Sequence, residues 1–165
     1  MRFSSVVLTL LLGAGLLCAQ GQKAPAMTDS KYGGADAIRA LPLAKLNALL
    51  ADPSASPYAK AKACQRLAVI GDRTSVAGAA ALLSDEHLSA YARTALEQIP
   101  GTAATDALVA ALPRLSGERL VGVINSLGVR RDIRAVDSLS KLVGSSDTAV
   151  SKAASLALAR TRPPL

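Results

Sequence analysis

Aromatic residues are almost missing from this sequence, which has no tryptophan, one phenylalanine and three tyrosines among 165 residues. β-Sandwiches and barrels depend on aromatic and β-branched side chains in alternation, so this shortage argues against an all-β fold. Half of the residues are nevertheless hydrophobic, and most of these are alanine, leucine and valine. Alanine and leucine are strong helix formers. The composition therefore predicts one modest all-α domain.

Cysteine and histidine are also scarce, and this excludes several kinds of site. The cysteines are Cys18 and Cys64, and the histidine is His87. One histidine and one cysteine in a mature chain cannot make an assignable metal cluster, and a single thiol cannot form an internal disulfide. The sequence has no G-x-S-x-G elbow and no glycine-rich phosphate loop. We therefore expect no cofactor and no enzymatic activity, and we expect Cys64 to be a small buried hydrophobe.

The basic residues do not indicate a nucleic-acid partner. The formal net charge is +7 with His87 neutral, a balance that can attract anionic partners. The lysines and arginines are, however, scattered among acids, and no aromatic residues stand between them for bases to stack on. We interpret the charges as solvated faces and expect no nucleic-acid binding.

The first 34 residues differ from the rest of the chain. One positive charge in the first five residues is followed by an apolar run from Val6 to Leu17 and then by small residues. This is the layout of a secretory signal peptide, and the run is too short for a comfortable membrane span. We place a signal peptide at 1–19 and a flexible leader at 20–34. The mature chain is then exported, periplasmic or secreted, with no transmembrane span. Leu17 argues against lipidation of Cys18, since a lipoprotein signal needs a small residue there.

From residue 35 onward the chain repeats itself. The segments 61–88, 90–120 and 120–150 each contain an apolar helical pattern, a glycine-containing corner, a second helical pattern and a short polar turn. Leucines recur in these segments at steps of 30 or 31 residues: Leu82, Leu112 and Leu142, and Leu96, Leu127 and Leu158. A pair of short helices cannot bury its apolar faces alone, whereas stacked pairs form one continuous core. The sequence predicts a solenoid of stacked helical hairpins over residues 35–165.

Glycine, proline and aspartate mark the expected helix ends. Three glycines follow the last apolar residue of a helical pattern, and we expect each to be a left-handed C-cap: Gly71, Gly101 and Gly128. The pairs Ser84-Asp85 and Ser146-Asp147 precede the next helical pattern, where their oxygens can accept from the free N–H groups of a first turn. Pro113 falls within a helical pattern and predicts a kink or an early break.

Two of these units resemble HEAT repeats, and most of all the short PBS-lyase-type HEAT repeats of bacterial proteins: LAVIGDRTSVAGAAALLSD and NSLGVRRDIRAVDSLSKLVGSSD. The resemblance extends from about Leu41 to Arg160. It implies a right-handed α-solenoid that offers a long curved surface to a protein or peptide partner. Some proteins with such repeats resemble bilin lyases, but this chain offers no assignable active site for that role.

The resemblance implies binding on the concave face, which we expect the second helices of the hairpins to form. Four polar or amphipathic residues on these helices are candidate contacts: Arg66, Tyr91, Arg93 and Asn125. Asn125 lies among apolar neighbours, and two interpretations of it stay open. As a buried amide it bonds the backbone of a neighbouring repeat; on the concave face it contacts a peptide.

The stretch GVRRD, residues 128–132, also has two interpretations. In the first, Gly128 and Asp132 cap two successive helices, and one arginine satisfies backbone carbonyls or pairs with an acid of the adjacent repeat. In the second, Arg130, Arg131 and Arg134 form a small basic pocket for a carboxylate or phosphate. We favour the first.

Taken together, the sequence predicts an exported, non-catalytic scaffold that binds a protein or peptide partner. A second class is a structural or regulatory module whose terminal repeats dock onto another protein or self-associate. The ending ALARTRPPL supports this class in part, because a solenoid end needs a polar cap and none is obvious there. A bilin-lyase-like enzyme comes last.

Overall fold

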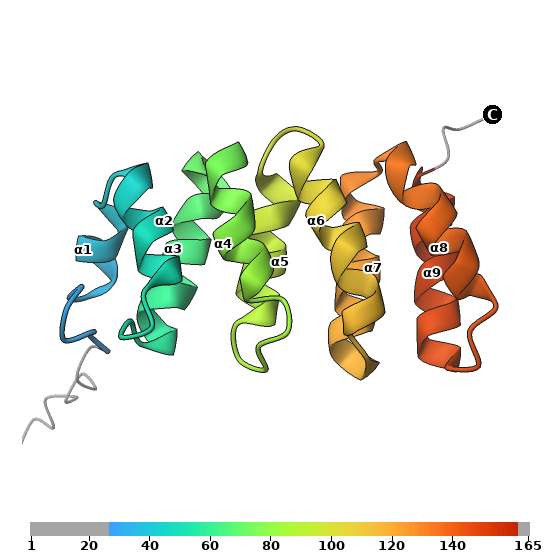
Figure 1. Ribbon diagram of the computed structural model, residues 1–165, viewed down its shortest axis with the longest axis horizontal. Coiled ribbons are helices and arrows are strands. Elements are labelled where there is room, and N and C mark those ends of the chain that lie inside the picture. The colour runs from blue at the N-terminus through green and yellow to red at the C-terminus, as the bar shows by residue number, and fades with distance from the viewer. Residues whose placement is uncertain (1–26, 162–165) are drawn as a thin grey trace, which may run out of the picture.

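The computed structural model describes residues 27–161, and within them the chain is all-helical (Figure 1). This range contains nine α-helices, three short 3-10 helices and no strand. The α-helices are α1 (Ala35–Arg39), α2 (Leu43–Ala51), α3 (Pro57–Ile70), α4 (Val76–Ala81), α5 (Ser89–Gln98), α6 (Ala103–Ala111), α7 (Gly117–Arg130), α8 (Val136–Val143) and α9 (Thr148–Thr161). The 3-10 helices are η1 (Arg73–Ser75), η2 (Leu112–Arg114) and η3 (Ile133–Ala135). The all-α prediction is confirmed, whereas the proposed signal peptide and Cys18 lie outside the described residues.

The helices form two layers that follow the order of the chain. In one layer each odd-numbered helix contacts the next, from α1 through α3, α5 and α7 to α9. In the other layer α2 contacts α4, α4 contacts α6, and α6 contacts η3, which leads into α8. Figure 1 shows the same order, since the colours pass along the molecule from one end to the other. Helices that are neighbours in the repeat pattern are therefore neighbours in space.

The contacts also define how consecutive helices pair. The most extensive packing between consecutive helices joins α2 with α3, α4 with α5, α6 with α7, and α8 with α9. The three segments aligned in the sequence begin instead at α3, α5 and α7, one helix out of step with these pairs. A periodic pattern defines the length of a repeat but not where a repeat begins, so the phase had to come from packing. In the observed pairs α3, α5 and α7 are second helices.

The core is one cluster of leucine, isoleucine, valine and alanine side chains. The recurrent leucines belong to it or pack against it: Leu82, Leu96, Leu112, Leu127 and Leu158 are buried, and Leu142 is half-buried. Cys64 is fully buried in this cluster, and burial raises the pKa of its thiol to about 12. A thiol with that pKa is neutral near pH 7 and unreactive, so the prediction for Cys64 is confirmed.

Of the two predicted polar helix starts, the one at Asp147 is confirmed, whereas Asp85 caps a turn that precedes its helix. The Asp85 Oδ1 accepts from the N–H groups of His87 and Leu88 just before α5. The Asp147 Oδ1 accepts from the N–H groups of the first turn of α9. Pro113 follows the end of α6 and lies in the 3-10 turn η2, so the expected break occurs there.

The glycine prediction is wrong at two of its three positions. Gly101 has a φ of 86° and lies in the turn after α5. Gly71 caps α3 in an extended conformation, and Gly128 lies inside α7, where it is buried. Helix α7 continues to Arg130, and Arg131 takes the left-handed cap position with a φ of 53°. The last apolar residue of a pattern marks the end of the buried face, and α7 extends beyond it.

The polar segment before α1 belongs to the folded domain from Asp29 onward, although we had placed it in the leader. The side chain of Asp29 is buried and accepts from the N–H groups of Lys31, Tyr32 and Ser56 at 2.8–2.9 Å. Tyr32 Oη and Lys31 Nζ both donate to Asp52 Oδ2, at 2.7 and 2.6 Å. A polar composition does not distinguish such a network from a linker, because both consist of the same residue types.

We expect Asp29→Asn to lower the free energy of unfolding by about 1.5–3 kcal/mol at pH 7, because a charged acceptor is lost and the new amide N–H₂ faces an N–H donor. Hydrogen bonds from Ser56, then from Tyr32 and Lys31, hold the pKa of Asp29 well below its usual value, against the opposing effect of burial. A lowered folded-state pKa stabilises the fold above the unfolded-state pKa, and that contribution is lost as the pH falls through the folded-state value.

Urea unfolding followed by circular dichroism, at pH 7 and at steps below about pH 4, checks both parts of this prediction. The difference in the free energy of unfolding between wild type and Asp29→Asn should be largest at pH 7 and should decrease as the solution is acidified. Asp36→Asn is the matched control, because that carboxylate is 97% exposed and should cost less than about 1 kcal/mol. A gap that widens on acidification would contradict the assigned role.

Candidate functional site

Arg130 joins the end of α7 to the corner between α5 and α6. Its guanidinium donates hydrogen bonds of 2.6–3.1 Å to the Thr105 hydroxyl and to four backbone carbonyls: Leu96, Glu97, Ile99 and Gly101. Carbonyls at the C-terminus of a helix have no partner within the helix, and a guanidinium supplies several donors in a fixed plane. Arg130 therefore satisfies backbone carbonyls, as the first interpretation of GVRRD expected.

Asp132 and Arg134 make the other connections of this corner. Asp132 Oδ1 accepts from the Arg134 N–H at 3.0 Å and caps η3. The Arg134 guanidinium forms an ion pair with Asp106 of α6 at 2.8 Å. Arg131 is exposed, and its guanidinium has no partner among residues 27–161. Two of the three arginines suggested as a basic pocket thus bind groups of this chain itself.

The same arrangement recurs at the corner between α3 and α4, which supports a structural role for it. Asp72 Oδ1 accepts from the Thr74 N–H at 2.8 Å and caps η1. The Thr74 hydroxyl accepts from Asn47 Nδ2 of α2 at 2.9 Å. At both corners the side chain two residues after the aspartate contacts the preceding even-numbered helix. These contacts connect the α4–α5 pair to α2 and the α8–α9 pair to α6.

The other side of the molecule offers a more open surface, which we call the odd-helix face. It consists of the outward stripes of four helices: Tyr58, Lys62, Gln65 and Val69 on α3; Tyr91, Thr94 and Gln98 on α5; Glu118, Val121, Asn125 and Val129 on α7; and Ala149, Lys152, Leu156 and Arg160 on α9. All of them are exposed or half-buried. Each of the four helices exposes one large apolar side chain on this face: Val69, Tyr91, Val129 and Leu156.

Three open grooves follow one another along the N-terminal halves of these helices. The first, of about 340 Å³, lies between α3 and α5 and is lined by Tyr58, Lys62 and Tyr91 among others. The second, of about 450 Å³, lies between α5 and α7, and the third, of about 430 Å³, extends to α9. Arg93 and Glu118 line both the second and the third groove. The two grooves therefore meet at Arg93.

Of the four candidate contacts, the structure brings Arg93 and Asn125 together in the third groove. Asn125 is exposed, which excludes the interpretation of a buried amide that bonds a neighbouring repeat. Tyr91 lines the first groove instead. Arg66 lies on α3 with its Nε buried and without a hydrogen-bond partner. All four lie on odd-numbered helices, which are the second helices of the observed pairs.

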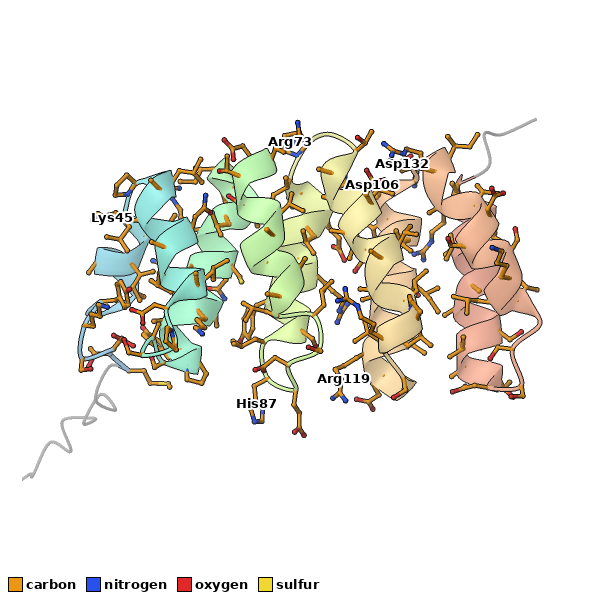
Figure 2. The ribbon with its side chains drawn as sticks, viewed as in Figure 1. Lys45, Arg73, His87, Asp106, Arg119 and Asp132 are labelled. Carbon is orange, nitrogen blue, oxygen red and sulfur yellow. The ribbon has the colours of Figure 1, made fainter. Side chains whose placement is uncertain are left out.

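The corner that contains Arg130, Asp132 and Arg134 lies far from the three grooves. Figure 2 shows Asp106 and Asp132, which contact the corner arginines, at one edge of the molecule, and His87 and Arg119 at the opposite edge. Arg119 lines the second groove and His87 the first. The candidate residues therefore form two separate places, of which the groove side is open and the corner is occupied by contacts within the chain.

The setting of Arg93 depends on Gly122, a residue that our sequence analysis did not select. A Cβ atom at position 122 would lie 2.7 Å from Arg93 Cζ and 2.8 Å from its Nε. The guanidinium of α5 thus lies directly against the backbone of α7, where only glycine leaves room for it. The signal in the sequence is a glycine in the middle of a helical pattern, which otherwise weakens a helix.

In the described part of the chain, no group of three or more histidine, cysteine, aspartate or glutamate side chains could hold a metal ion. No helix in that part is long and apolar enough to cross a membrane. Comparison of the chain with protein-family models, with curated proteins and with solved structures finds no match.

Proposed function

We propose that this chain is an exported, right-handed HEAT-like α-solenoid that binds a protein or peptide partner through its odd-helix face. It acts as a non-catalytic scaffold. The observation that carries this proposal is the exposure of one large apolar side chain on each of four successive second helices. Large apolar side chains exposed on one face among polar neighbours fit a protein-interaction site.

The opposite layer supports the choice of this face. The exposed positions of α2, α4 and α6 are mostly alanines with isolated charges, among them Ala48, Ala77 and Ala110. The large apolar residues exposed in this layer are Ile133 in η3 and Val143 at the end of α8. Interfaces are enriched in large amphipathic side chains and depleted in alanine. The helices α2, α4 and α6 therefore lack the large exposed apolar side chain that each of α3, α5, α7 and α9 carries.

The terminal helix bears on the alternative, in which end repeats self-associate. Outside the odd-helix face, the exposed residues of α9 are Thr148, Ser155 and Ala159, of which two are polar. A polar outer face is what allows a repeat array to end in water. This observation favours a partner on the odd-helix face over self-association through α9.

Site-specific photo-crosslinking in the cells that produce the protein tests the proposal. A photoreactive amino acid is placed at Gln65, Thr94 or Asn125 on the odd-helix face. It is placed in matched controls at the exposed alanines Ala48, Ala77 and Ala110. We expect a discrete adduct from the first set and none from the second. Adducts from both sets alike, or from neither, would refute binding through this face.

A further inference from the structure

Arg93, like Arg66, has unused hydrogen-bond donors. Its Nη1 donates one long bond of 3.3 Å to the carbonyl of Gly122. Its Nε is buried and has no partner, and no acid among the described residues forms an ion pair with it. Arg130 and Arg134, by contrast, are bound to carbonyls and to Asp106.

The acid nearest along the helix is occupied elsewhere. Glu97 follows Arg93 by four positions, a spacing at which side chains of opposite charge usually pair. Its Oε1 instead accepts from the Ser126 hydroxyl of α7 at 2.6 Å. The charge of Arg93 is therefore available in the groove, and a buried donor without an acceptor is costly. The Arg93 Nη2 also has no partner among the described residues, so the guanidinium keeps donors for an acceptor that enters the groove.

From this geometry we infer that the groove at Arg93 binds a single carboxylate of a peptide partner. The inference rests on the proposed function and names the group that the odd-helix face recognises. A guanidinium matches a planar carboxylate with two parallel hydrogen bonds. The Asn125 side chain lines the same groove and has two further N–H donors for an adjacent carbonyl.

The neighbouring acids define which anions fit. Glu118 lines both grooves and Asp147 lines the third, while the second groove also holds Glu86 and a second cation, Arg119. Asp147 already accepts two N–H groups of its own helix, but all three acids carry negative charge. A doubly charged phosphate or a polyanion is repelled by them, since like charges across an interface are strongly unfavourable. One carboxylate, from an aspartate or glutamate side chain or from a peptide C-terminus, remains.

A peptide array tests the inference and separates the two sources of the carboxylate. Short peptides of random sequence are presented with a free C-terminus and as C-terminal amides, and each hit is remade with glutamine for glutamate and asparagine for aspartate. We expect the wild-type protein to lose at least about tenfold in affinity when the required carboxylate is removed, a change of about 1.4 kcal/mol.

Two variants locate the binding to Arg93. Arg93→Gln removes the charge and should cause a similar loss of affinity. Gly122→Ala keeps the charge and favours the helix, but its Cβ displaces the guanidinium, so affinity should also fall. Arg73→Gln is the matched control, because Arg73 is exposed at the opposite edge from Arg119 (Figure 2), and it should bind as the wild type does.

Each outcome decides the inference. Carboxylate-dependent binding that Gly122→Ala and Arg93→Gln both weaken supports it, and melting curves show that the variants are folded. Peptides that bind regardless of their carboxylates, or that bind both variants as tightly as the wild type, overturn it. In that case the photo-crosslinks can still support binding through the odd-helix face. Absence of any peptide binding also overturns it, and if the photo-crosslinks fail as well, the proposed function falls with it.

Discussion

Arg130→Ala should lower the free energy of unfolding by about 3 kcal/mol, one of the two largest effects that we expect from a single substitution in this chain. The guanidinium is held by four carbonyls and the Thr105 hydroxyl. Its removal leaves partly buried carbonyls at the end of α5 without donors. Water reaches some of them, including that of Gly101, so the cost is well below the sum of the separate bonds.

Urea unfolding at pH 7 measures the effect, with two further variants as references. Arg134→Ala removes a neighbouring arginine whose ion pair with Asp106 is about half exposed, and pairs of that kind contribute about 0–1 kcal/mol. Arg130→Lys keeps the charge but not the planar fork, and should fall between wild type and Arg130→Ala. Equal losses for Arg130→Ala and Arg134→Ala would show that the contacts of Arg130 with the α5–α6 corner contribute little.

Much of the helical framework could be predicted because it depends on local sequence. The recurrent leucines define the buried faces by their spacing alone. Asp72 caps η1 and Asp147 caps α9 with hydrogen bonds that reach only two or three residues along the chain. Capping of this kind can be inferred from a short window of sequence.

Other features depend on contacts between distant residues, and the sequence alone did not reveal them. Asp29 accepts a hydrogen bond from the N–H group of Ser56, 27 positions away, although the composition of its own segment is that of a linker. The pairing of each even-numbered helix from α2 to α8 with the helix that follows it depends on packing. A periodic pattern does not determine that pairing. Gly128 was expected at a helix end, but a glycine is needed there because Ala157 of α9 lies directly against it.

The candidate site shows the same division. Arg93 and Asn125 could be selected as polar side chains within helical patterns. Their common groove, and the role of Gly122 beneath Arg93, depend on the register between α5 and α7. That register is determined by how small side chains on the two helices fit together, and residue types at a fixed spacing do not specify it. For Arg130 and Arg134, the sequence fitted both a structural role and an anion-binding pocket. Their contacts with the α5 carbonyls and with Asp106 decide for the structural role.

Gly128→Val should destabilise the fold by about 3 kcal/mol, because α7 and α9 touch at this point. A Cβ at position 128 would lie 2.9 Å from Ala157 Cα and 3.0 Å from Ala157 Cβ. An obstructing backbone atom cannot rotate away as the end of a long side chain can. Helix α9 would have to shift, although a side chain at 128 would otherwise favour the helix over glycine.

Gly144→Val is the matched control, since a Cβ at that glycine meets nothing within 4 Å and its φ is negative at −83°. Its effect should stay within about 0.5 kcal/mol. Hydrogen exchange then locates the damage: in Gly128→Val the amides of α9 should lose protection before those of α3 and α5, because α9 is the end of the row and rests on α7. If Gly128→Val and Gly144→Val unfold at the same urea concentration, α7 and α9 do not touch at this point, and the packing of the last two helix pairs would need to be redrawn.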